Sequence, residues 1–170
     1  MQPINLVPIL ATMADDIRAL EMDQPLMIGI HTGGAWIAAA LHEMLGLESP
    51  LGTLDISFYR DDFSRVGLNP SVKSSSLPES LESRQVILVD DVLYTGRTIR
   101  AALDEIFSWG RPALVRLAVA LDRPGRELPV QADVIGQTLD LTADRQAKIA
   151  RDDNGSLWFD IISRNEGIRQ

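Results

Sequence analysis

The feature that most constrains this sequence is the stretch from Val86 to Thr98, where a strand pattern passes directly into a helix pattern. Residues 86–89 are an unbroken aliphatic run, which predicts a strand buried on both faces. Asp90 and Asp91 follow it, and residues 99–107 repeat apolar side chains at helical spacing. Because open α/β sheets bind ligands at the carboxyl ends of their strands, this junction is the expected ligand site.

The junction combines two kinds of ligand contact. The carboxylates of Asp90 and Asp91 can accept hydrogen bonds from sugar hydroxyls or hold a hydrated divalent cation. The turn Thr-Gly-Arg-Thr at 95–98 adds hydroxyl groups and the N–H groups of a helix start, which suit a phosphate monoester. A ligand that carries two hydroxyls close to a phosphate is a ribose 5-phosphate.

An Asp-Asp pair after a strand also occurs in P-loop enzymes and in receiver domains. A P-loop enzyme would carry Gly-x-x-x-x-Gly-Lys-Ser/Thr before the pair, and the sequence has no such run. A receiver domain would carry its acidic pair near the first strand, whereas this pair follows a third one. Both classes are therefore disfavoured.

A second strand–turn–helix unit precedes this junction. An apolar strand pattern at 26–30 leads into the turn His-Thr-Gly-Gly at 31–34, and helical spacing follows over 35–45. Parallel strands would place this glycine-rich turn at the same sheet edge as the aspartate pair. The turn is therefore a candidate anion site, with a plain connector that binds nothing as the alternative.

The remaining patterns alternate between helices and strands. Helical spacing covers residues 5–21, and further strand patterns lie at 51–59, 113–121, 132–136 and 156–162. We expect an α/β fold: a doubly wound, mostly parallel sheet of about five strands with flanking helices. The length of 170 residues suits a single domain over 1–170.

Residues 60–83 are polar and rich in glycine, serine and proline, with no clear helix or strand pattern. A stretch of this length inside a compact domain predicts a flexible lid loop over the site. Arg60, Arg65 and Lys73 would then reach the ligand, and the closed lid would exclude water. The alternative is a hairpin extension that makes subunit contacts.

Composition limits the partners of the chain. The 24 acidic and 16 basic residues give a net charge of −8, which disfavours polyanion binding unless basic residues cluster. No cysteine is present, so disulfides and thiolate metal sites are excluded. No apolar run approaches the ~20 residues that span a bilayer, and the first residues lack the basic start of a secretory signal. We therefore expect a soluble, cytoplasmic protein without membrane contact.

The order of apolar strand, Asp-Asp, three residues and Thr-Gly-x-Thr resembles the phosphoribosyl pyrophosphate (PRPP) signature of the type I phosphoribosyltransferases. Other segments resemble the PyrR family, whose members regulate pyrimidine operons and are also uracil phosphoribosyltransferases. These segments are 54–62, 96–102, 110–113, 122–123 and 126–129. The resemblance covers roughly residues 26–137 and implies the type I phosphoribosyltransferase fold.

The resemblance implies the reaction of uracil with PRPP to give UMP and pyrophosphate, with Mg2+ as cofactor. It also implies regulation of pyrimidine genes in response to nucleotides, and assembly into a homo-oligomer. Two alternatives stay open: a nucleotide-sensing regulator with little or no catalysis, and a purine phosphoribosyltransferase.

The same resemblance assigns roles to individual residues. Asp90 and Asp91 would be catalytic, bind the ribose hydroxyls, and hold the metal directly or through water. The pyrophosphate would contact Thr32, Gly33, Gly34 and Arg60. In the turn at 31–34 the family often has a non-proline cis peptide bond. The base would lie near Asp122 and Arg123. The 5-phosphate would be held by Val92, Leu93, Tyr94, Thr95, Gly96, Arg97 and Thr98.

Two departures from the family pattern bear on function. The family commonly has Lys-Thr-Arg-Gly at the 31–34 turn, so Gly33 replaces an arginine that would pair with pyrophosphate. RNA-binding members carry basic residues on the first helix, where this chain has Asp15 and Asp16. The remaining candidate patch is Arg123, Arg126, Arg145, Lys148 and Arg151, and these charges predict that RNA is not bound tightly.

Overall fold

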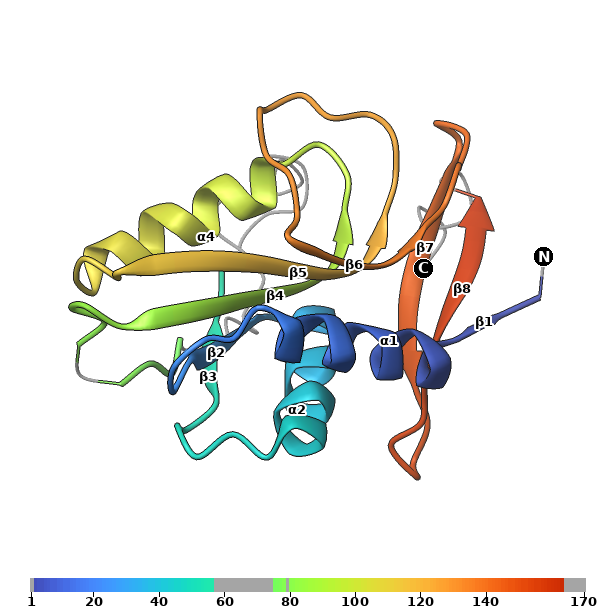
Figure 1. Ribbon diagram of the computed structural model, residues 1–170. Helices are drawn as coiled ribbons and strands as arrows, with labels where there is room; N and C mark the ends of the chain where they lie inside the picture. Colours follow the sequence, from blue (N-terminus) through green and yellow to red (C-terminus); the bar gives the residue numbers. More distant parts are fainter. Residues whose placement is uncertain (1, 57–74, 79, 164–170) are drawn as a thin grey trace.

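The computed structural model describes residues 2–56, 75–78 and 80–163, and its centre is a parallel sheet (Figure 1). The sheet contains β2 (Leu26–Ile30), β3 (Gly52–Leu54), β4 (Gln85–Leu93), β5 (Leu114–Asp122) and β6 (Val134–Thr138). Its order is β3-β2-β4-β5-β6, and every neighbouring pair is parallel. The predicted doubly wound, parallel α/β sheet is therefore confirmed.

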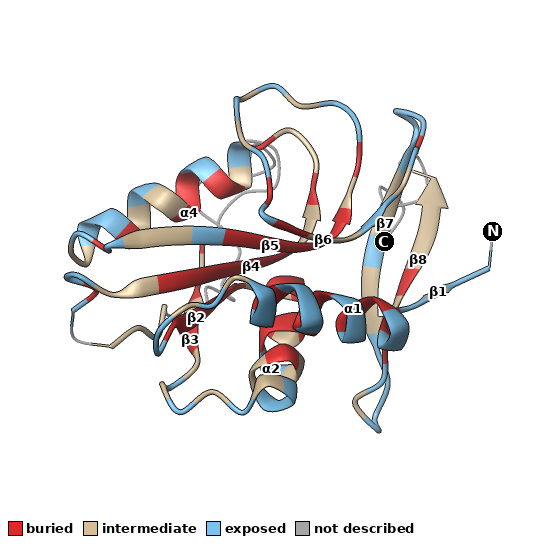
Figure 2. Ribbon diagram, viewed as in Figure 1, coloured by how far each residue is buried: buried red, intermediate tan, exposed pale blue. Residues whose placement is uncertain are grey.

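Helices cover both faces of this sheet (Figure 1). α1 (Leu6–Ala19) and α2 (Gly33–Leu45) pack on one face, and α4 (Arg97–Ser108) packs on the other. Alternate residues of β4 belong to two separate core clusters, one with α1 and α2 and one with α4. Figure 2 shows the central strands buried between these two helical layers. None of the helices in the described part of the chain combines the length and the apolar character of a membrane-spanning helix.

A second, antiparallel sheet lies against α1, and the sequence patterns do not predict it. It consists of β1 (Ile4–Asn5), β8 (Leu157–Ser163) and β7 (Arg145–Arg151), in the order β1-β8-β7. The strand predicted at 156–162 corresponds to β8, but β7 is rich in charged residues and shows no clear strand pattern. β7 forms because it pairs with β8 along its whole length, which brings Ala147 and Ile149 against the main core.

Phe159 of β8 connects the two sheets. Its side chain is fully buried in the same cluster as Leu6 and Met13 of α1 and residues of β4. α1 approaches the parallel sheet closely at Gly136, where a Cβ atom would lie 2.3 Å from Cγ2 of Ile9. The small sheet, α1 and one face of the parallel sheet therefore share a single core.

The aspartate pair lies inside a strand rather than after one. The strand predicted to end at Val89 continues as β4 to Leu93, because its pairing with β5 runs on to Asp122. On its other side, β4 pairs with β2 only as far as Val89. Asp90 and Asp91 therefore lie where β4 extends beyond one neighbour and is still held by the other.

Other boundaries also differ from the predicted ones by one or two residues, β6 at Val134–Thr138 among them, where the pattern predicts 132–136. α2 begins at Gly33, two residues before the helix pattern predicts it. The strand pattern at 51–59 forms β3 over Gly52–Leu54, and its last residues lie outside the described part of the chain.

The predicted lid, residues 60–83, lies mostly outside the described part of the chain, since residues 57–74 are not described, Arg60 among them. The described end of the segment is packed. Ser76 is joined to β3 by two backbone hydrogen bonds of 2.8 Å, and buried Leu81 donates its N–H to the carbonyl at the C-cap of α4. The closing of a lid over the site stays a prediction.

Phe159→Ala should lower the free energy of unfolding by about 3–5 kcal/mol, because it removes a fully buried aromatic ring where the two sheets meet. Phe107→Ala is the matched control, since Phe107 is 56% exposed on α4 and its loss should change stability by less than about 0.5 kcal/mol. Urea unfolding followed by circular dichroism measures both values. Equal losses in the two variants would contradict the role assigned to Phe159.

Candidate active site

The two turns singled out in the sequence lie at the carboxyl edge of the parallel sheet. The 31–34 turn joins β2 to α2, and the 94–96 loop joins β4 to α4. Gly33 contacts Asp91 directly, since a Cβ atom on Gly33 would lie 2.2 Å from Oδ2 of Asp91. A Cβ atom on Gly34 would lie 2.5 Å from a carbonyl oxygen of β4. The structure therefore brings the aspartate pair and the glycine-rich turn together.

The two aspartates differ in burial. Asp90 is only 2% exposed, and its Oδ1 accepts the backbone N–H of Asp91 at 2.9 Å. Asp91 is half-buried, and its Oδ1 accepts the N–H of Val92 at 2.9 Å. These local bonds hold each carboxylate against its own strand, while Oδ2 of Asp91 faces Gly33. A ligand seated beside the 31–34 turn would therefore meet the Asp91 carboxylate.

The 31–34 turn leads into α2 without a connecting segment. The peptide bond between His31 and Thr32 is cis, in the turn where the resemblance places such a bond. His31 donates its N–H to the carbonyl of Leu54, the last residue of β3, at 2.8 Å. The N–H of Trp36 donates to the carbonyl of Thr32 at 3.3 Å, so the helix begins directly after Thr32. Because first-turn N–H groups of a helix lack intrahelical acceptors, this turn suits an anion.

The 94–96 loop leads into α4 through a glycine. Gly96 is the N-cap of α4 and has a φ of 91°, a left-handed conformation that favours glycine. Oγ1 of Thr95 accepts the N–H of Arg97 at 3.3 Å. α2 and α4 therefore both begin at this sheet edge, and each adds the positive end of a helix dipole.

The loop before α4 rests on residues 123–130, which follow β5. The N–H groups of Glu127 and Leu128 both donate to the carbonyl of Thr95, at 2.9 and 3.1 Å. The Glu127 carboxylate also forms an ion pair of 2.6 Å with Arg97, the first residue of α4. The shape of the predicted phosphate loop thus depends on the loop beside it.

Arg126 joins the same two segments through its guanidinium group. It donates to the carbonyl of Tyr94 and, at 2.6 Å, to Oδ1 of Asp122. The sequence reasoning assigned no part in the phosphate loop to Arg126 or Glu127. The available signal was a charged Arg-Glu pair directly after the Pro-Gly turn that ends β5.

Asp122 and Arg123, which the resemblance places near the base, line a pocket of about 450 Å³ at the ends of β5 and β6. The other lining residues are Pro124, Gly125, Arg126, Thr138 and Asp140. The pocket offers carboxylate and hydroxyl groups that can form hydrogen bonds with a polar ring. Contact between these residues and a base stays a prediction.

Arg123 is almost fully buried, at 4% exposure. Its guanidinium group donates to the carbonyls of Leu141, Thr142 and Arg145, at 2.8–3.3 Å. The guanidinium carbon also lies 4.1 Å from the ring centroid of Tyr94. Arg123 therefore connects the 94–96 loop with the segment that precedes β7.

A divalent cation at this edge would take some of its ligands from the protein and the others from the substrate. Among the residues that the structure describes, no group of three or more His, Cys, Asp or Glu side chains is arranged to hold a metal. Asp90 and Asp91 supply carboxylate oxygens, and Mg2+ commonly binds one or two carboxylates together with substrate phosphates. The residues present therefore fit a metal ion that binds together with a phosphorylated ligand.

A family model and several known proteins match most of this chain in sequence. A family model described as phosphoribosyl transferase domain matches residues 5–149. The bifunctional protein PyrR of Pseudomonas paraeruginosa is 53% identical over 149 residues, which cover 85% of this chain and 88% of that protein. The bifunctional protein PyrR of Nitrosococcus oceani is 56% identical over 135 residues, which cover 78% of this chain and 76% of that protein.

Solved structures share the fold at much lower identity. A hypoxanthine phosphoribosyltransferase from Trypanosoma cruzi, in complex with the product IMP, has a TM-score of 0.64 at 19% identity, over 97% of this chain and 95% of that chain. A hypoxanthine-guanine phosphoribosyltransferase from Bacillus anthracis has a TM-score of 0.64 at 17% identity, over 82% of this chain and 84% of that chain. The structural likeness supports the fold and the sequence relatives identify the branch, so the chain belongs to the PyrR family of type I phosphoribosyltransferases.

Proposed function

We propose that this protein transfers the phosphoribosyl group of PRPP to uracil, giving UMP and pyrophosphate, and that it regulates pyrimidine genes in response to nucleotides. The observation that carries the proposal is the contact between the aspartate pair on β4 and the two glycines that begin α2. Two helix starts and two carboxylates at one sheet edge suit a ribose with a phosphate at one end and a pyrophosphate at the other. The PyrR relatives, each more than half identical, support uracil as the base.

Asp90 and Asp91 are the proposed catalytic residues. Their carboxylates would accept hydrogen bonds from the ribose hydroxyls and stabilise the positive charge that develops on the ring as the bond to pyrophosphate breaks. Mg2+, when bound, would neutralise charge on the leaving pyrophosphate. A nitrogen of the base attacks the ribose carbon directly, so the protein needs no nucleophilic side chain and contributes mainly by positioning.

The phosphate groups would occupy the two helix starts. We assign the 5-phosphate to residues 92–98, which include the end of β4, the 94–96 loop and the start of α4. We assign the pyrophosphate to Thr32, Gly33 and Gly34, with Arg60 reaching it from the lid over residues 60–83. The base would lie in the pocket beside Asp122 and Arg123.

The proposal also covers the organisation of the protein. We propose one phosphoribosyltransferase domain over residues 1–170 and assembly into a homo-oligomer, a dimer or higher. Sedimentation equilibrium would measure the assembly directly, and a monomer at all concentrations would contradict that part of the proposal.

The double variant Asp90→Asn, Asp91→Asn should lose uracil phosphoribosyltransferase activity by a factor on the order of 100 or more, because the amides no longer stabilise positive charge on the ribose. The assay is conversion of labelled uracil to UMP with PRPP and magnesium. Asp104→Asn is the control, because Asp104 is exposed on α4 and pairs with Arg100 away from the turns. A wild-type protein that neither makes nor binds UMP would refute the proposed function.

A regulator with little or no catalysis is the second candidate, and Gly33 is the observation that favours it. This turn lacks the arginine that would pair with pyrophosphate. A side chain at position 33 would also collide with the Asp91 carboxylate and with Cγ2 of Ile149, at 2.2 and 2.7 Å. Binding of UMP without its formation would favour this candidate over the enzyme.

Gly33→Ala should reduce turnover on the order of tenfold to a hundredfold, because the new methyl group must push the Asp91 carboxylate out of place. Gly46→Ala serves as control: its Cβ atom meets nothing within 4 Å, but the φ of 61° makes alanine strained. The control should therefore lose stability and keep its turnover. Unchanged turnover in Gly33→Ala would mean that Asp91 can move without cost to the reaction.

A purine phosphoribosyltransferase is a weaker alternative. The solved purine enzymes match at 17–23% identity, which supports a shared fold, whereas the PyrR relatives match at 50–56%. Competition between uracil and hypoxanthine for labelled PRPP would separate the two, because pockets built on hydrogen bonds reject the wrong base strongly.

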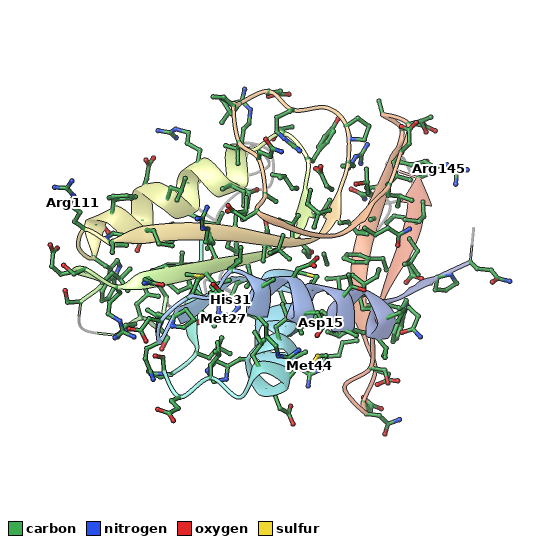
Figure 3. The ribbon with its side chains drawn as sticks, in the orientation of Figure 1. Asp15, Met27, His31, Met44, Arg111 and Arg145 are labelled. Carbon is green, nitrogen blue, oxygen red and sulfur yellow. The ribbon has the colours of Figure 1, made fainter. Side chains whose placement is uncertain are left out.

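RNA binding should be weak, because the basic residues of the candidate patch named above do not form one continuous exposed surface. Arg123 is buried and Arg126 is paired with Asp122. Strand alternation places Lys148 on the opposite face of β7 from Arg145. Figure 3 shows Arg145 on the small sheet and the acidic Asp15 on α1.

Filter binding to a pyrimidine-operon leader RNA, with and without UMP and over a range of salt concentrations, tests the RNA prediction. Few phosphate contacts give low affinity and a shallow salt dependence. Tight binding that UMP strengthens and salt weakens steeply would contradict the prediction and place the regulatory contact on RNA.

A further inference from the structure

We propose that Arg126 is a positioning residue for phosphoribosyl transfer: it holds the 94–96 loop in the shape that receives the 5-phosphate of PRPP and UMP. This inference rests on the proposed function. Arg126 comes from the loop after β5, outside the segment that carries the PRPP signature.

The first step of the argument is the pair of bonds that Arg126 makes. One nitrogen of its guanidinium group donates to the carbonyl of Tyr94, and the other donates to Oδ1 of Asp122 at 2.6 Å. Asp122 is itself fixed, because β4 and β5 pair in register at Leu93 and Asp122. A planar guanidinium group with two simultaneous partners has a defined orientation. Arg126 thus ties the backbone of Tyr94 to the end of β5.

The second step concerns the direction of the backbone in the 94–96 loop. The carbonyl of Tyr94 points to Arg126, and the carbonyl of Thr95 accepts two N–H groups from the 123–130 loop. In a trans peptide the carbonyl and the N–H of the next residue point in opposite directions. These two peptides are trans, so the N–H groups of Thr95 and Gly96 point away from the 123–130 loop. Adjacent backbone N–H groups that point to the same side can bind an anion together.

The third step is that Arg126 acts through the loop and not as a phosphate ligand itself. Its charge is balanced by the Asp122 carboxylate, with the side chains only 27% and 21% exposed. Two of its nitrogens already have acceptors. Its contribution to binding is therefore the orientation of the N–H groups of Thr95 and Gly96, which act at the ligand.

Arg123 and Gly125 hold the same loop by a different route. The Arg123 guanidinium lies over the Tyr94 ring, and a Cβ atom on Gly125 would lie 2.3 Å from Cε2 of that ring. These contacts fix the side chain of Tyr94 and leave its carbonyl to Arg126. Removal of Arg126 should therefore disturb the backbone direction of the loop while the Tyr94 ring stays in place.

Calorimetric binding of UMP and of uridine tests the proposal, because uridine lacks the phosphate. Arg126→Ala should weaken UMP binding on the order of tenfold to a hundredfold, as expected for the loss of a charge-assisted hydrogen bond. Uridine binding should fall by a smaller factor than UMP binding, since Arg126 also lines the pocket assigned to the base. The KM for PRPP should rise in parallel with the Kd for UMP. Arg126→Lys should recover part of the loss, because an ammonium group keeps the charge but not the planar pair of bonds.

Arg116→Ala is the matched control, since Arg116 is also ion-paired, with Asp133 at 2.8 Å, and lies far from the 94–96 loop at the other end of β5. It should leave UMP binding unchanged. Equal UMP affinity in Arg126→Ala and the wild type would overturn the proposal, as would equal losses for UMP and uridine. Arg126→Gln replaces Arg126→Ala if the latter does not fold.

The two proposals fail in different ways. A wild-type protein that binds UMP without making it would refute the enzyme and leave the UMP measurement as the test of Arg126. A wild-type protein that makes UMP, with an Arg126→Ala variant of unchanged KM for PRPP, would refute the role of Arg126 alone. Absence of both UMP formation and UMP binding in the wild type would refute both.

Discussion

The unequal pairing of β4 with its two neighbours is the constraint on which the site depends. β4 pairs with β2 only as far as Val89, and with β5 as far as Leu93. The strand is thus held firmly on one side, while the other side opens towards the start of α2. Helices that follow parallel strands begin at the carboxyl edge of the sheet, so α2 and α4 both begin there. Asp90 and Asp91 lie in the short stretch between the two pairing limits.

Close packing of backbone against backbone requires glycine at several positions of this sheet edge. Gly29 and Gly34 allow α2 to approach β2 and β4, since Cβ atoms there would lie 2.6 Å from Cα of Ala35 and 2.5 Å from a carbonyl oxygen. Gly33 allows the Asp91 carboxylate to lie against the helix start. An arginine in place of Gly33 would therefore need a different position of the Asp91 side chain. The composition of this turn and the geometry of the aspartate pair depend on each other.

The sequence predicts most of the parallel sheet, because buried strands such as 86–89 are continuous aliphatic runs that only a two-sided core explains. It predicts that the 31–34 turn and the aspartate pair meet, because parallel topology implies a common edge. It does not predict β7, whose charged residues gain strand structure only from pairing with β8. Nor does it predict Arg126, because the contact with Tyr94 joins residues that are 32 positions apart. Such contacts depend on how the strands pair, and local sequence patterns do not show which residues are paired.

Two arginines at the described part of this edge are already balanced by carboxylates, although the expected ligand is a polyanion. Arg126 is balanced by Asp122 and Arg97 by Glu127, and Arg123 is buried against carbonyl groups. Among the residues that the structure describes, oriented N–H groups and helix starts are therefore the main features left to attract an anion in this chain of net charge −8. Oriented peptide dipoles have a fixed direction and do not titrate, so their effect on a ligand depends on the exact shape of the loops that hold them. Residues that fix loop shape should therefore affect binding in addition to the residues that touch the phosphate.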